Sequence, residues 1–371
     1  MQKIIGLVHT RFSAVGGVEN YISKLVPALL ERDWLIHYFT AKINKPVPRR
    51  VIIHKIPIIR GTSLSRMLSF AYGGRRAIQQ ADLPLVMGFG RTIYQDIYRD
   101  GSGCFLDYEK HAGKRFNRLY RKCYLHLERK RYKDARLKKV VTVSQMVKDQ
   151  IIRRYHIPSE KIEVLYSGIA AHVLNPDLKK QKSDYRKQLQ IPEDVLTLLF
   201  IGNEFKRKGL EFLINAVACL PERLPLMVLV AGSDKKAGHY LKLAKATGRF
   251  ERFRFLGYQK DVSILYGAAD LFVLPSLFDP IANVVLESLY TGTPVVTGKQ
   301  VGASELIEHG LNGYIVTDYS QENLAQAILS YHHSLEKEKM SQRAHRVAAA
   351  YRWDDHFNRL EAIFLGLLKR R

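Results

Sequence analysis

Residues 275–288 read PSLFDPIANVVLES and residues 292–296 read GTPVV, and this region decides the fold. Two short apolar runs bound it, Leu271–Leu274 and Pro294–Thr297, and each is typical of a buried strand. Between them, residues 283–291 have the apolar spacing of a helix. A strand, a helix and a second strand in this order predict a parallel sheet with the helix packed on one face.

Two acidic residues stand out in this region. Asp279 lies in the loop after the first strand, and Glu287 follows eight positions later inside the helix. A carboxylate in an otherwise apolar helix is costly to bury unless it has partners. Ribose hydroxyls are suitable partners, because carboxylates of nucleotide-binding folds often hold the ribose. The pair therefore predicts a nucleotide site at this end of the sheet.

The same alternation of strands and helices extends along the chain on both sides of this region. Further strands are expected near 195–201, 226–231 and 253–256, and in the first half near 3–9, 35–40, 51–56, 83–87, 137–143 and 161–165. Helices are expected near 21–30, 64–78, 144–155, 209–220 and 237–247. Alternation of this kind predicts an α/β fold with a doubly wound parallel sheet in each half.

The length and the composition predict where the chain divides. A chain of 371 residues exceeds one ordinary core, and the composition changes after Gly168. We therefore expect domains at 1–168 and 169–350, followed by a C-terminal segment at 351–371. That segment carries an apolar helical face, which predicts that it packs back on the first domain: Phe357, Leu360, Ile363, Phe364 and Leu367.

Glycines and cations follow several expected strands. Gly202 ends a strand and opens a loop that contains Arg207 and Lys208 just before a helix, which favours an anion such as a diphosphate. A second strand ends in Gly257-Tyr258, followed by Asp261-Val262 at a helix start. Gly302 begins a third such connection, where open backbone amides are expected. In the first half, the loop Ser13-Ala14-Val15-Gly16-Gly17 follows the first strand.

Taken in order, these motifs resemble the family-4 retaining glycosyltransferases of the GT-B fold, most clearly over residues 195–317. The resemblance implies two Rossmann-like domains facing a cleft and a nucleotide-sugar donor. It implies that Asp279 stands where the family's usual Glu binds the donor sugar, that Glu287 holds the ribose, and that Arg207 and Lys208 neutralise the diphosphate. The remaining donor-binding residues implied by it are Gly16, Gly17, Gly202, Tyr258, Val262, Asn283, Val284 and Val285, the last three through backbone amides.

Within that family, the chain is most similar to bacterial lipopolysaccharide core glycosyltransferases. The likeness rests on Asp96-Ile97-Tyr98-Arg99 with Gly101-Ser102-Gly103, and on Gly302–Ile307. Related enzymes often carry His or Asp in or just after that glycine segment. Here Ser102, Cys104 and Phe105 stand there, and the nearby acids Asp100 and Asp107 are the alternatives, with Asp100 as the candidate catalytic group. The implied reaction moves a hexose, with glucose as the first choice, from a UDP-sugar to a phosphorylated envelope glycolipid.

The implied mechanism uses neither a metal nor a cofactor. Cleavage of the sugar–diphosphate bond builds negative charge that Arg207, Lys208 and helix N-termini would stabilise electrostatically. The sequence has no Asp-x-Asp pair of the metal-using kind, and Asp107-Tyr108-Glu109 is the nearest approach to one. The family retains the anomeric configuration, with the leaving phosphate acting as the base.

The charge is strongly one-sided. The net charge is +24, and residues 1–168 carry 32 Lys and Arg against 13 Asp and Glu, a net of +19. Residues 110–139 hold 13 of these cations against 2 acids. This basic segment is either a solvated helix face or a surface that contacts an anionic membrane or a phosphorylated acceptor. The candidate contacts are Arg121, Lys122, Arg129, Lys130 and Arg131.

The remaining features bear on location and on the alternative function. Three scattered cysteines and no run of about 20 apolar residues favour a cytoplasmic protein held at the inner face of the cell membrane. The excess positive charge also leaves open a basic Rossmann-like binding protein, perhaps for nucleic acid, with a degenerate donor site. No recognised nucleic-acid-binding motif is present, and the ordered set of Arg207, Lys208, Asp279 and Glu287 favours the enzyme.

Overall fold

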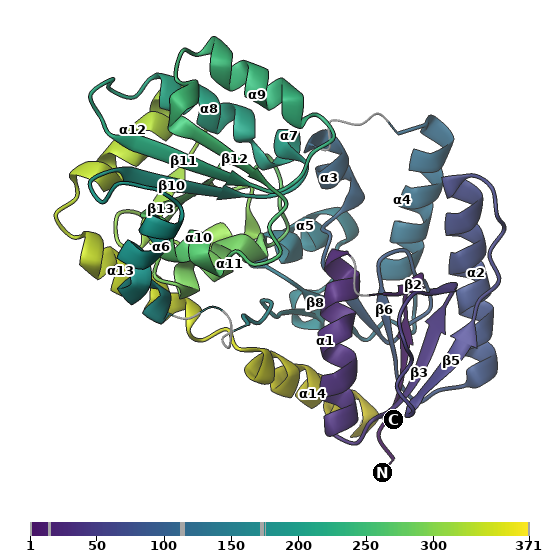
Figure 1. Ribbon diagram of the computed structural model, residues 1–371. Coiled ribbons are helices and arrows are strands. Elements are labelled where there is room, and N and C mark those ends of the chain that lie inside the picture. The colour runs from purple at the N-terminus through teal and green to yellow at the C-terminus, as the bar shows by residue number, and fades with distance from the viewer. Residues whose placement is uncertain (1, 14–15, 112–115, 171–173, 175, 370–371) are drawn as a thin grey trace. The chain divides into compact units, whose positions relative to one another are not determined.

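The computed structural model describes residues 2–13, 16–111, 116–170, 174 and 176–369. They form two compact units, each with its own parallel sheet (Figure 1). Unit 1 consists of described residues within 2–110 and 116–166 together with 354–369, and unit 2 covers 167–353. The chain therefore leaves unit 1 after Tyr166 and returns at Asp354, compared with the expected changes at 168 and 350.

Unit 1 is built on a seven-stranded sheet in which the paired strands are parallel. In sheet order the strands are β5 (Val51–Lys55), β3 (Leu35–Thr40), β1 (Ile4–Val8), β6 (Val86–Phe89), β7 (Ile97–Asp100), β8 (Lys139–Thr142) and β9 (Ile162–Val164). A separate pair joins β2 (Arg11–Phe12) to β4 (Lys42–Ile43). The helices are α1 (Gly17–Glu31), α2 (Ser63–Ala81), α3 (Phe105–His111), α4 (Arg118–Tyr132), α5 (Gln145–Tyr155) and α14 (Trp353–Lys369).

Unit 2 has a six-stranded parallel sheet. In sheet order the strands are β12 (Phe253–Gly257), β11 (Leu226–Ala231), β10 (Leu196–Ile201), β13 (Leu271–Leu274), β14 (Val295–Gly298) and β15 (Gly313–Val316). The helices are α6 (Lys182–Gln188), α7 (Phe205–Lys208), α8 (Leu210–Ala218), α9 (Ala237–Ala246), α10 (Ser263–Ala268), α11 (Asn283–Tyr290), α12 (Gln321–His333) and α13 (Lys337–Ala348). The predicted α/β class with two doubly wound sheets is confirmed.

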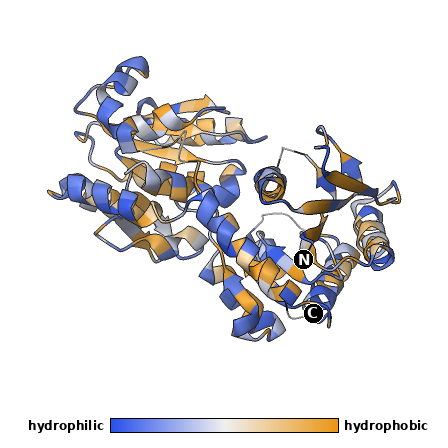
Figure 2. Ribbon diagram, turned by 90° about the horizontal axis from the view of Figure 1, so that it is seen from below, coloured by the Kyte–Doolittle hydropathy of each residue, from blue (hydrophilic) through white to orange (hydrophobic). Residues whose placement is uncertain are grey.

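The strands carry the core of each unit. Figure 2 shows the hydrophobic colour concentrated on the strands, with hydrophilic residues on the outer helices. In β10 and β13 every residue is buried, as expected when helices cover both faces of a parallel sheet. The crossover order, in which β10 lies between β11 and β13, brings the carboxyl ends of these strands to one edge. That edge is where ligands bind in open α/β sheets.

The C-terminal helix α14 belongs to unit 1, as predicted. Phe364 packs its ring edge against the buried Trp34, with 5.4 Å between ring centroids. Glu361 pairs with Lys3 at 2.9 Å and accepts a hydrogen bond from Trp34 Nε1 at 2.9 Å. The helix therefore ties the end of the chain to its beginning. Ile363 and Leu367, which share the predicted apolar face, are only partly buried.

Candidate functional site

The carboxyl end of β10 in unit 2 delivers the two predicted cations. After Gly202 the chain turns into the short helix α7, which ends with Arg207 and Lys208. A Cβ atom at Gly202 would lie 3.0 Å from Lys208 Cγ, so the glycine makes room for the lysine side chain. The Gly202 amide donates to Ala231 O at 3.0 Å. The sequence predicted that this glycine makes room for a ligand, whereas in the structure it makes room for the Lys208 side chain.

Lys208 and Asp279 form a buried ion pair, although 71 positions separate them. Lys208 Nζ donates to Asp279 Oδ2, and Arg207 Nη1 lies 3.5 Å from the same oxygen. Arg207 Nη1 also donates to Phe278 O at 2.8 Å. Burial alone raises the pKa of the Asp279 carboxyl, but the charges of Lys208 and Arg207 outweigh it, so the pKa lies below its ordinary value. Asp279 is therefore an anion that holds both cations at the strand end.

The second oxygen of Asp279 supports the start of α11. Asp279 Oδ1 accepts from the amide of Ala282 at 2.7 Å and from that of Ile281 at 3.3 Å. Ala282 has a φ of 56°, in the left-handed region, and the helix begins at the next residue. With both carboxylate oxygens engaged, Asp279 is suited to positioning Lys208 and this turn.

The backbone of α11 offers fewer donors than the sequence predicted. The Val285 amide donates to Ala282 O at 2.8 Å and its side chain is fully buried, so the expectation that it faces a ligand is wrong. Asn283 is exposed and Val284 half-buried at the first two positions of the helix. First-turn amides of a helix have no partner within the helix, so these two remain the candidate backbone donors.

Glu287 lies one turn further along α11 and has a partner that the sequence analysis missed. Tyr266, on α10, donates through its hydroxyl to Glu287 Oε2 at 2.9 Å. Burial, and then the charge of Glu287, raise the pKa of Tyr266 well above its ordinary value, so the phenol stays protonated as the donor. A tyrosine inside an apolar segment was the available signal, because a buried hydroxyl needs a partner. Tyr266 thus orients the carboxylate that was predicted to hold a ribose.

Three other predicted positions in unit 2 have different surroundings. Tyr258 is 70% exposed and Val262 caps α10, where its carbonyl accepts from Leu265 and Tyr266 amides. The expectation of open amides at Gly302 is wrong, because the Gly302 amide donates to Asp279 O at 2.8 Å. This bond anchors the Asp279 loop against the 3-10 helix Gly302–Leu306.

In unit 1, the glycine loop after β1 leads directly into α1. Ala14 and Val15 of that predicted loop lie outside the described residues. Gly16 has a φ of 121°, a backbone conformation that residues with a Cβ atom rarely adopt, and this favours glycine at the position. At Gly17 a Cβ would meet nothing within 4 Å, which leaves the start of α1 open.

A histidine missed by the sequence analysis stands beside this loop. His9 directly follows β1, is 7% exposed, and places Nε2 3.4 Å from Glu19 Oε1. The interaction with His9 is the largest of the causes that lower the pKa of the Glu19 carboxyl. A histidine immediately after the first buried strand was the signal that could have found it. The His9–Glu19 pair places a polar group at the carboxyl end of the central strand.

Asp100 occupies the end of β7 and is fully engaged there. Its Oδ1 accepts from the amides of Ser102 at 3.0 Å and Gly103 at 2.8 Å, and its Oδ2 accepts from the Tyr132 hydroxyl at 2.6 Å. The side chain is 1% exposed. This geometry makes Asp100 the support of the Gly101–Gly103 turn.

Beyond that turn lies a cavity of about 390 Å³ with aromatic walls. Phe105 stacks on Tyr124 with 4.2 Å between ring centroids, and the Arg91 guanidinium lies 5.5 Å from the Tyr124 centroid and 5.9 Å from that of Tyr120. Tyr108, Phe116, Ser102 and Gly103 complete the described lining, which includes no acid. A ring of aromatic faces with one exposed guanidinium suits a sugar that carries an anionic group.

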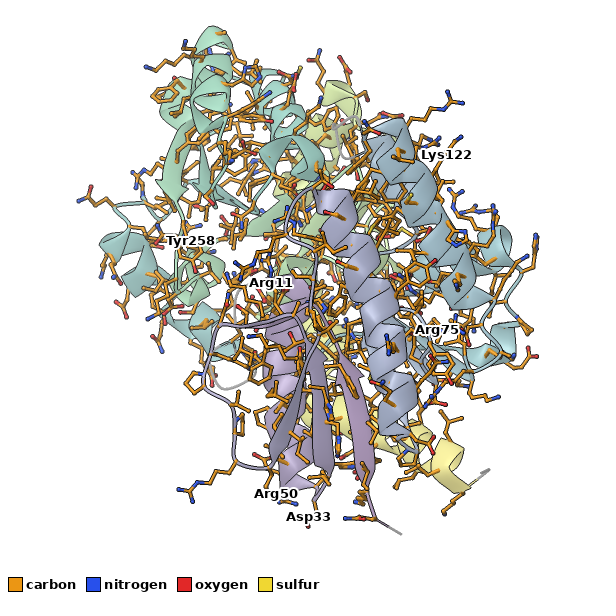
Figure 3. The ribbon with its side chains drawn as sticks, turned by 90° about the vertical axis from the view of Figure 1, so that its right-hand side faces the viewer. Arg11, Asp33, Arg50, Arg75, Lys122 and Tyr258 are labelled. Carbon is orange, nitrogen blue, oxygen red and sulfur yellow. The ribbon has the colours of Figure 1, made fainter. Side chains whose placement is uncertain are left out.

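The predicted basic set on α4 divides by burial. Arg121, Lys122 and Arg129 are exposed, and Figure 3 shows Lys122 extending outward from the helix. Arg121 pairs with Glu109 at 2.7 Å, and Lys130 lies over the Tyr72 ring at 4.8 Å. The prediction that Arg131 belongs to this exposed surface is wrong. Residues 112–115 of the basic segment lie outside the described residues.

Arg131 is 2% exposed and faces the core of unit 1. Its Nε donates to Thr92 O at 2.9 Å, and its guanidinium lies over Tyr98 at 4.2 Å from the ring centroid. Tyr132 and Glu128, next to it on α4, are buried as well. The reason is helical geometry, because residues three and four apart share a face and Arg131 follows the buried Leu127 by four positions. Arg131 therefore anchors the helix.

Two properties of the described residues bear on metal and membrane chemistry. No group of three or more His, Cys, Asp and Glu side chains is arranged in them to hold a metal ion. None of their helices combines the length and the apolar character that crossing a membrane requires.

The two parallel sheets, with cations and carboxylates at their strand ends, have the architecture of the GT-B class of proteins. The family comparisons agree with this class: the model described as glycosyl transferases group 1 matches residues 181–347, and the one described as glycosyltransferase family 4 matches residues 15–172. The chain belongs to the glycosyltransferases of these two matching families.

Individual relatives support the same assignment. The chain is 30% identical over 192 residues to the uncharacterized glycosyltransferase MJ1607 of Methanocaldococcus jannaschii, and this match spans 51% of the chain and about half (49%) of that relative. It is 24% identical over 332 residues to the lipopolysaccharide glucosyltransferase WaaG of Escherichia coli K12, which covers 88% of each protein.

Solved structures share the fold. The crystal structure of WaaG, a glycosyltransferase involved in lipopolysaccharide biosynthesis, superposes with a TM-score of 0.81 at 22% identity, over 98% of this chain and 100% of that one. HepE from Anabaena, solved in complex with UDP-glucose, superposes with a TM-score of 0.70 at 18% identity, over 98% and 99% of the two chains.

Proposed function

We propose that this protein transfers a hexose, glucose in the first instance, from a UDP-sugar to a lipopolysaccharide core or other envelope glycolipid. The carrying observation is the set of groups at the strand ends of unit 2: Lys208 and Arg207 on Asp279, with Glu287 held by Tyr266 nearby on α11 and α10. The sugar and the base are suggested by two similar proteins, the lipopolysaccharide glucosyltransferase WaaG and HepE in its complex with UDP-glucose.

The cations would act on the leaving group. Bond cleavage leaves a diphosphate whose added negative charge is best stabilised by positive groups already in place. Lys208 and Arg207 are such groups, because Asp279 fixes their positions before a donor arrives. Asp279 is thus a positioning residue for the cations, in addition to any contact with the donor sugar. Reaction would proceed with retention and without a metal, since Lys and Arg supply the charge that a divalent ion supplies elsewhere.

Glu287 would bind the ribose hydroxyls. One carboxylate oxygen accepts from Tyr266, which sets the orientation of a group that has about four acceptor positions in all. Hydrogen bonds to a charged group are about twice as strong as neutral ones. The exposed Asn283 and the half-buried Val284 lie one turn before it, and their amides are the candidate contacts for the donor.

The acceptor side belongs to unit 1. The aromatic cavity beyond the Asp100-supported turn would take a sugar ring, and Arg91 would pair with a phosphate on it. The open start of α1 at Gly17 and the His9–Glu19 pair lie at the end of the same sheet. These groups support a phosphorylated glycolipid as the acceptor.

The basic surface of α4 would hold the enzyme at the inner face of the cell membrane. Arg121, Lys122 and Arg129 are exposed, and Leu119 on the same helix is 58% exposed. Basic residues near an anionic surface gain about 1 kcal/mol each, and an exposed apolar side chain can insert beside them. Co-sedimentation with anionic vesicles should be strong at low salt, lost at high salt, and much reduced in Arg121→Gln/Lys122→Gln/Arg129→Gln. Tight duplex DNA binding without vesicle binding would contradict this.

A transfer assay tests the enzymatic proposal. Purified protein is incubated with UDP-glucose and a phosphorylated core glycolipid, and both UDP release and glycolipid glucosylation are followed. We expect transfer by the wild type, an α-linked product, and loss of both signals in Lys208→Met. The matched control is Lys206→Met, because Lys206 is exposed on the same helix. Equal activity of the two variants, or no turnover of any UDP- or other nucleotide-sugar by the wild type, would contradict the proposal.

A further inference from the structure

A second cavity lies in unit 1, below helix α14. Its volume is about 770 Å³, within the range of ordinary ligand sites. Leu85, Asp96, Lys139 and Lys161 line it, and each stands just before, or at the first residue of, a strand between β6 and β9. The cavity is therefore at the amino ends of these strands, whereas Gly16 and Asp100 follow or occupy carboxyl ends. It is distinct from the candidate transfer site.

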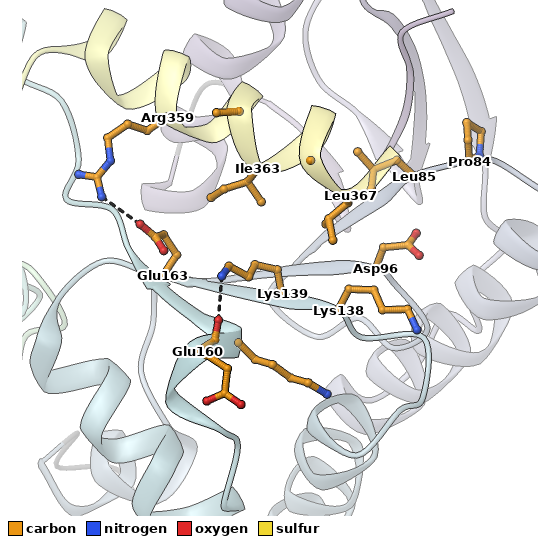
Figure 4. Close-up of a pocket in the computed structure, with 13 residues that line it drawn as sticks. Pro84, Leu85, Asp96, Lys138, Lys139, Glu160, Glu163, Arg359, Ile363 and Leu367 are labelled. Carbon is orange, nitrogen blue, oxygen red and sulfur yellow. Dashed lines mark hydrogen bonds and ion pairs between the residues drawn. The ribbon is translucent and has the colours of Figure 1, made fainter. Parts of the chain in front are cut away.

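The wall formed by α14 is aliphatic. Ile363 and Leu367 point from the helix into this space, and Leu85 and Pro84 lie beside Leu367 at one end of it (Figure 4). The sequence predicted that Ile363 and Leu367 would be covered, yet both remain partly exposed because they face the cavity. The described lining contains no aromatic ring on which a base or a sugar could stack. An aliphatic trough of this kind suits a hydrocarbon chain.

Gly366 keeps the trough open. It lines the cavity from the interior of α14, and a Cβ atom at this position would meet nothing within 4 Å. Glycine inside a helix costs about 1 kcal/mol relative to alanine, and close packing, its usual reason, is absent here. A ligand that occupies the space beside this position would explain why glycine is present in the helix.

The rim of the cavity is cationic. Two of the three acids that line it form ion pairs: Asp96 pairs with Arg136 at 2.9 Å, and Glu163 pairs with Arg359 at 3.0 Å. Three ammonium groups remain at the rim, those of Lys138, Lys139 and Lys161, against the exposed carboxylate of Glu160. Lys138 and Lys139 donate to backbone carbonyls, of Ala135 at 3.2 Å and of Glu160 at 2.8 Å, and no carboxylate among the described residues forms an ion pair with either.

We propose that this groove binds one acyl chain of an anionic lipid, with the lipid phosphate on Lys138 and Lys161 and the chain along Ile363, Gly366 and Leu367. The aliphatic wall selects a hydrocarbon chain, and the rim selects a negative head group. This site would retain individual lipid molecules, in contrast to the electrostatic surface of α4. It stands whether or not the transferase proposal holds, because none of its residues belongs to the transfer site.

Short-chain phosphatidylglycerol below its critical micelle concentration tests the proposal, because a monomeric lipid has no surface for α4 to bind. Calorimetric titration of the full chain should show one site. Its affinity should rise about fourfold for each CH₂ added to the chain until the trough is filled, as expected from about 0.8 kcal/mol per buried CH₂. Gly366→Leu should abolish binding by filling the trough while improving the helix.

Matched variants separate the causes. Gly238→Leu in α9 makes the same change at a helical glycine whose Cβ is equally unobstructed, and it should bind as the wild type does. Lys138→Gln/Lys161→Gln should weaken binding at least tenfold and keep the dependence on chain length. Arg121→Gln/Lys122→Gln should leave it unchanged. The proposal is overturned if affinity is independent of chain length, if inorganic phosphate displaces the lipid, or if a folded Gly366→Leu binds as the wild type does.

Discussion

Cations serve different purposes in the two units. In unit 2, Arg207 and Lys208 are held at a strand end by Asp279, a carboxylate that is itself bonded to two backbone amides. In unit 1, helix α4 presents Arg121, Lys122 and Arg129 to solvent. The first arrangement is preorganised and needs a ligand of fixed geometry, such as a diphosphate. The second is diffuse and suits a surface such as a membrane.

The contrast teaches that charge alone does not reveal function. Unit 1 has by far the larger excess of cations, yet the arrangement suited to chemistry is the small, nearly neutral cluster of unit 2. Arg131 is an example, because it is one of the basic residues of α4 but is buried against Thr92 and Tyr98. The position of a cation on its helix and the partner it finds decide its role.

The largest expected effect concerns Lys208. Lys208→Met removes one of the two groups that would meet the leaving diphosphate, so the transfer rate should fall roughly 10²- to 10³-fold. It also leaves a buried carboxylate with only Arg207 nearby, which should cost about 3 kcal/mol in the free energy of unfolding. Steady-state kinetics and denaturant unfolding measure the two effects.

A double variant separates catalysis from stability. Lys208→Met/Asp279→Asn removes both charges, so stability should largely return while transfer stays low. If the double variant regained activity together with stability, Lys208 would be a structural residue and the comparison between the units would fail.

The second effect is an acid sensitivity confined to unit 1. His356 on α14 is buried between the Tyr21 hydroxyl at 2.9 Å and Tyr166 O at 2.7 Å. Burial, and then the charge of Arg99, lower its pKa to about 4. Because the unfolded histidine binds a proton more readily, this stability is complete above pH 6.5 and is lost as the pH falls towards 4.

The linked loss amounts to about 3 kcal/mol of unfolding free energy for unit 1. Hydrogen exchange of α1 and α14 at pH 7 and pH 4.5 measures it, with His356→Gln as the variant that should show a flatter dependence. Unit 2 helices provide the internal control, and an equal acid sensitivity of α11 would assign the effect to other groups.

A third, smaller effect distinguishes the cations of α4. Arg131→Gln should destabilise unit 1 by about 2 kcal/mol, because it removes a buried charged hydrogen bond and a cation–π contact. Arg129→Gln, two positions earlier, should change stability by less than about 0.5 kcal/mol and weaken vesicle binding instead. Thermal unfolding and co-sedimentation of the same two proteins test this division, and a reversed pattern would contradict it.

The smallest expected effect is that of chelation. With Lys208 and Arg207 supplying positive charge, transfer in EDTA should remain within about twofold of the untreated rate. Loss of activity that Mg²⁺ or Mn²⁺ restores would show that the cations of unit 2 are insufficient on their own.

Much of the fold could be predicted from local sequence, and its exceptions have clear reasons. The strands Leu35–Thr40, Leu226–Ala231 and Leu271–Leu274 have the predicted bounds, because each is a short apolar run between polar flanks. Strand β7 was missed because its four residues, Ile97–Asp100, include Arg99 and Asp100, which are buried through tertiary partners. Such partners lie far away in the sequence.

The sequence predicted which residues form the candidate site, but it predicted only some of the contacts between them. Arg207, Lys208, Asp279 and Glu287 were named because their order along the chain resembles that of the family's donor-site residues, and each follows or lies near the carboxyl end of a predicted strand. The Lys208–Asp279 bond, the Tyr266 donor and the engaged amides of Val285 and Gly302 depend on loops meeting across 20 to 70 positions or on local turn geometry. His9 was missed because its partner Glu19 lies on the following helix, although its place directly after the first buried strand was a usable signal.

In the proposed function, unit 2 binds a nucleoside diphosphate with Glu287 on its ribose, and calorimetric titration with UDP measures this binding. The wild type should bind UDP at one site, and Glu287→Ala should bind at least about tenfold more weakly, because a charge-assisted partner of the ribose is worth about 1.5–3 kcal/mol. Glu308→Ala, an exposed acid of the same unit, should bind as the wild type does. Unchanged UDP affinity in a folded Glu287→Ala protein would contradict the account.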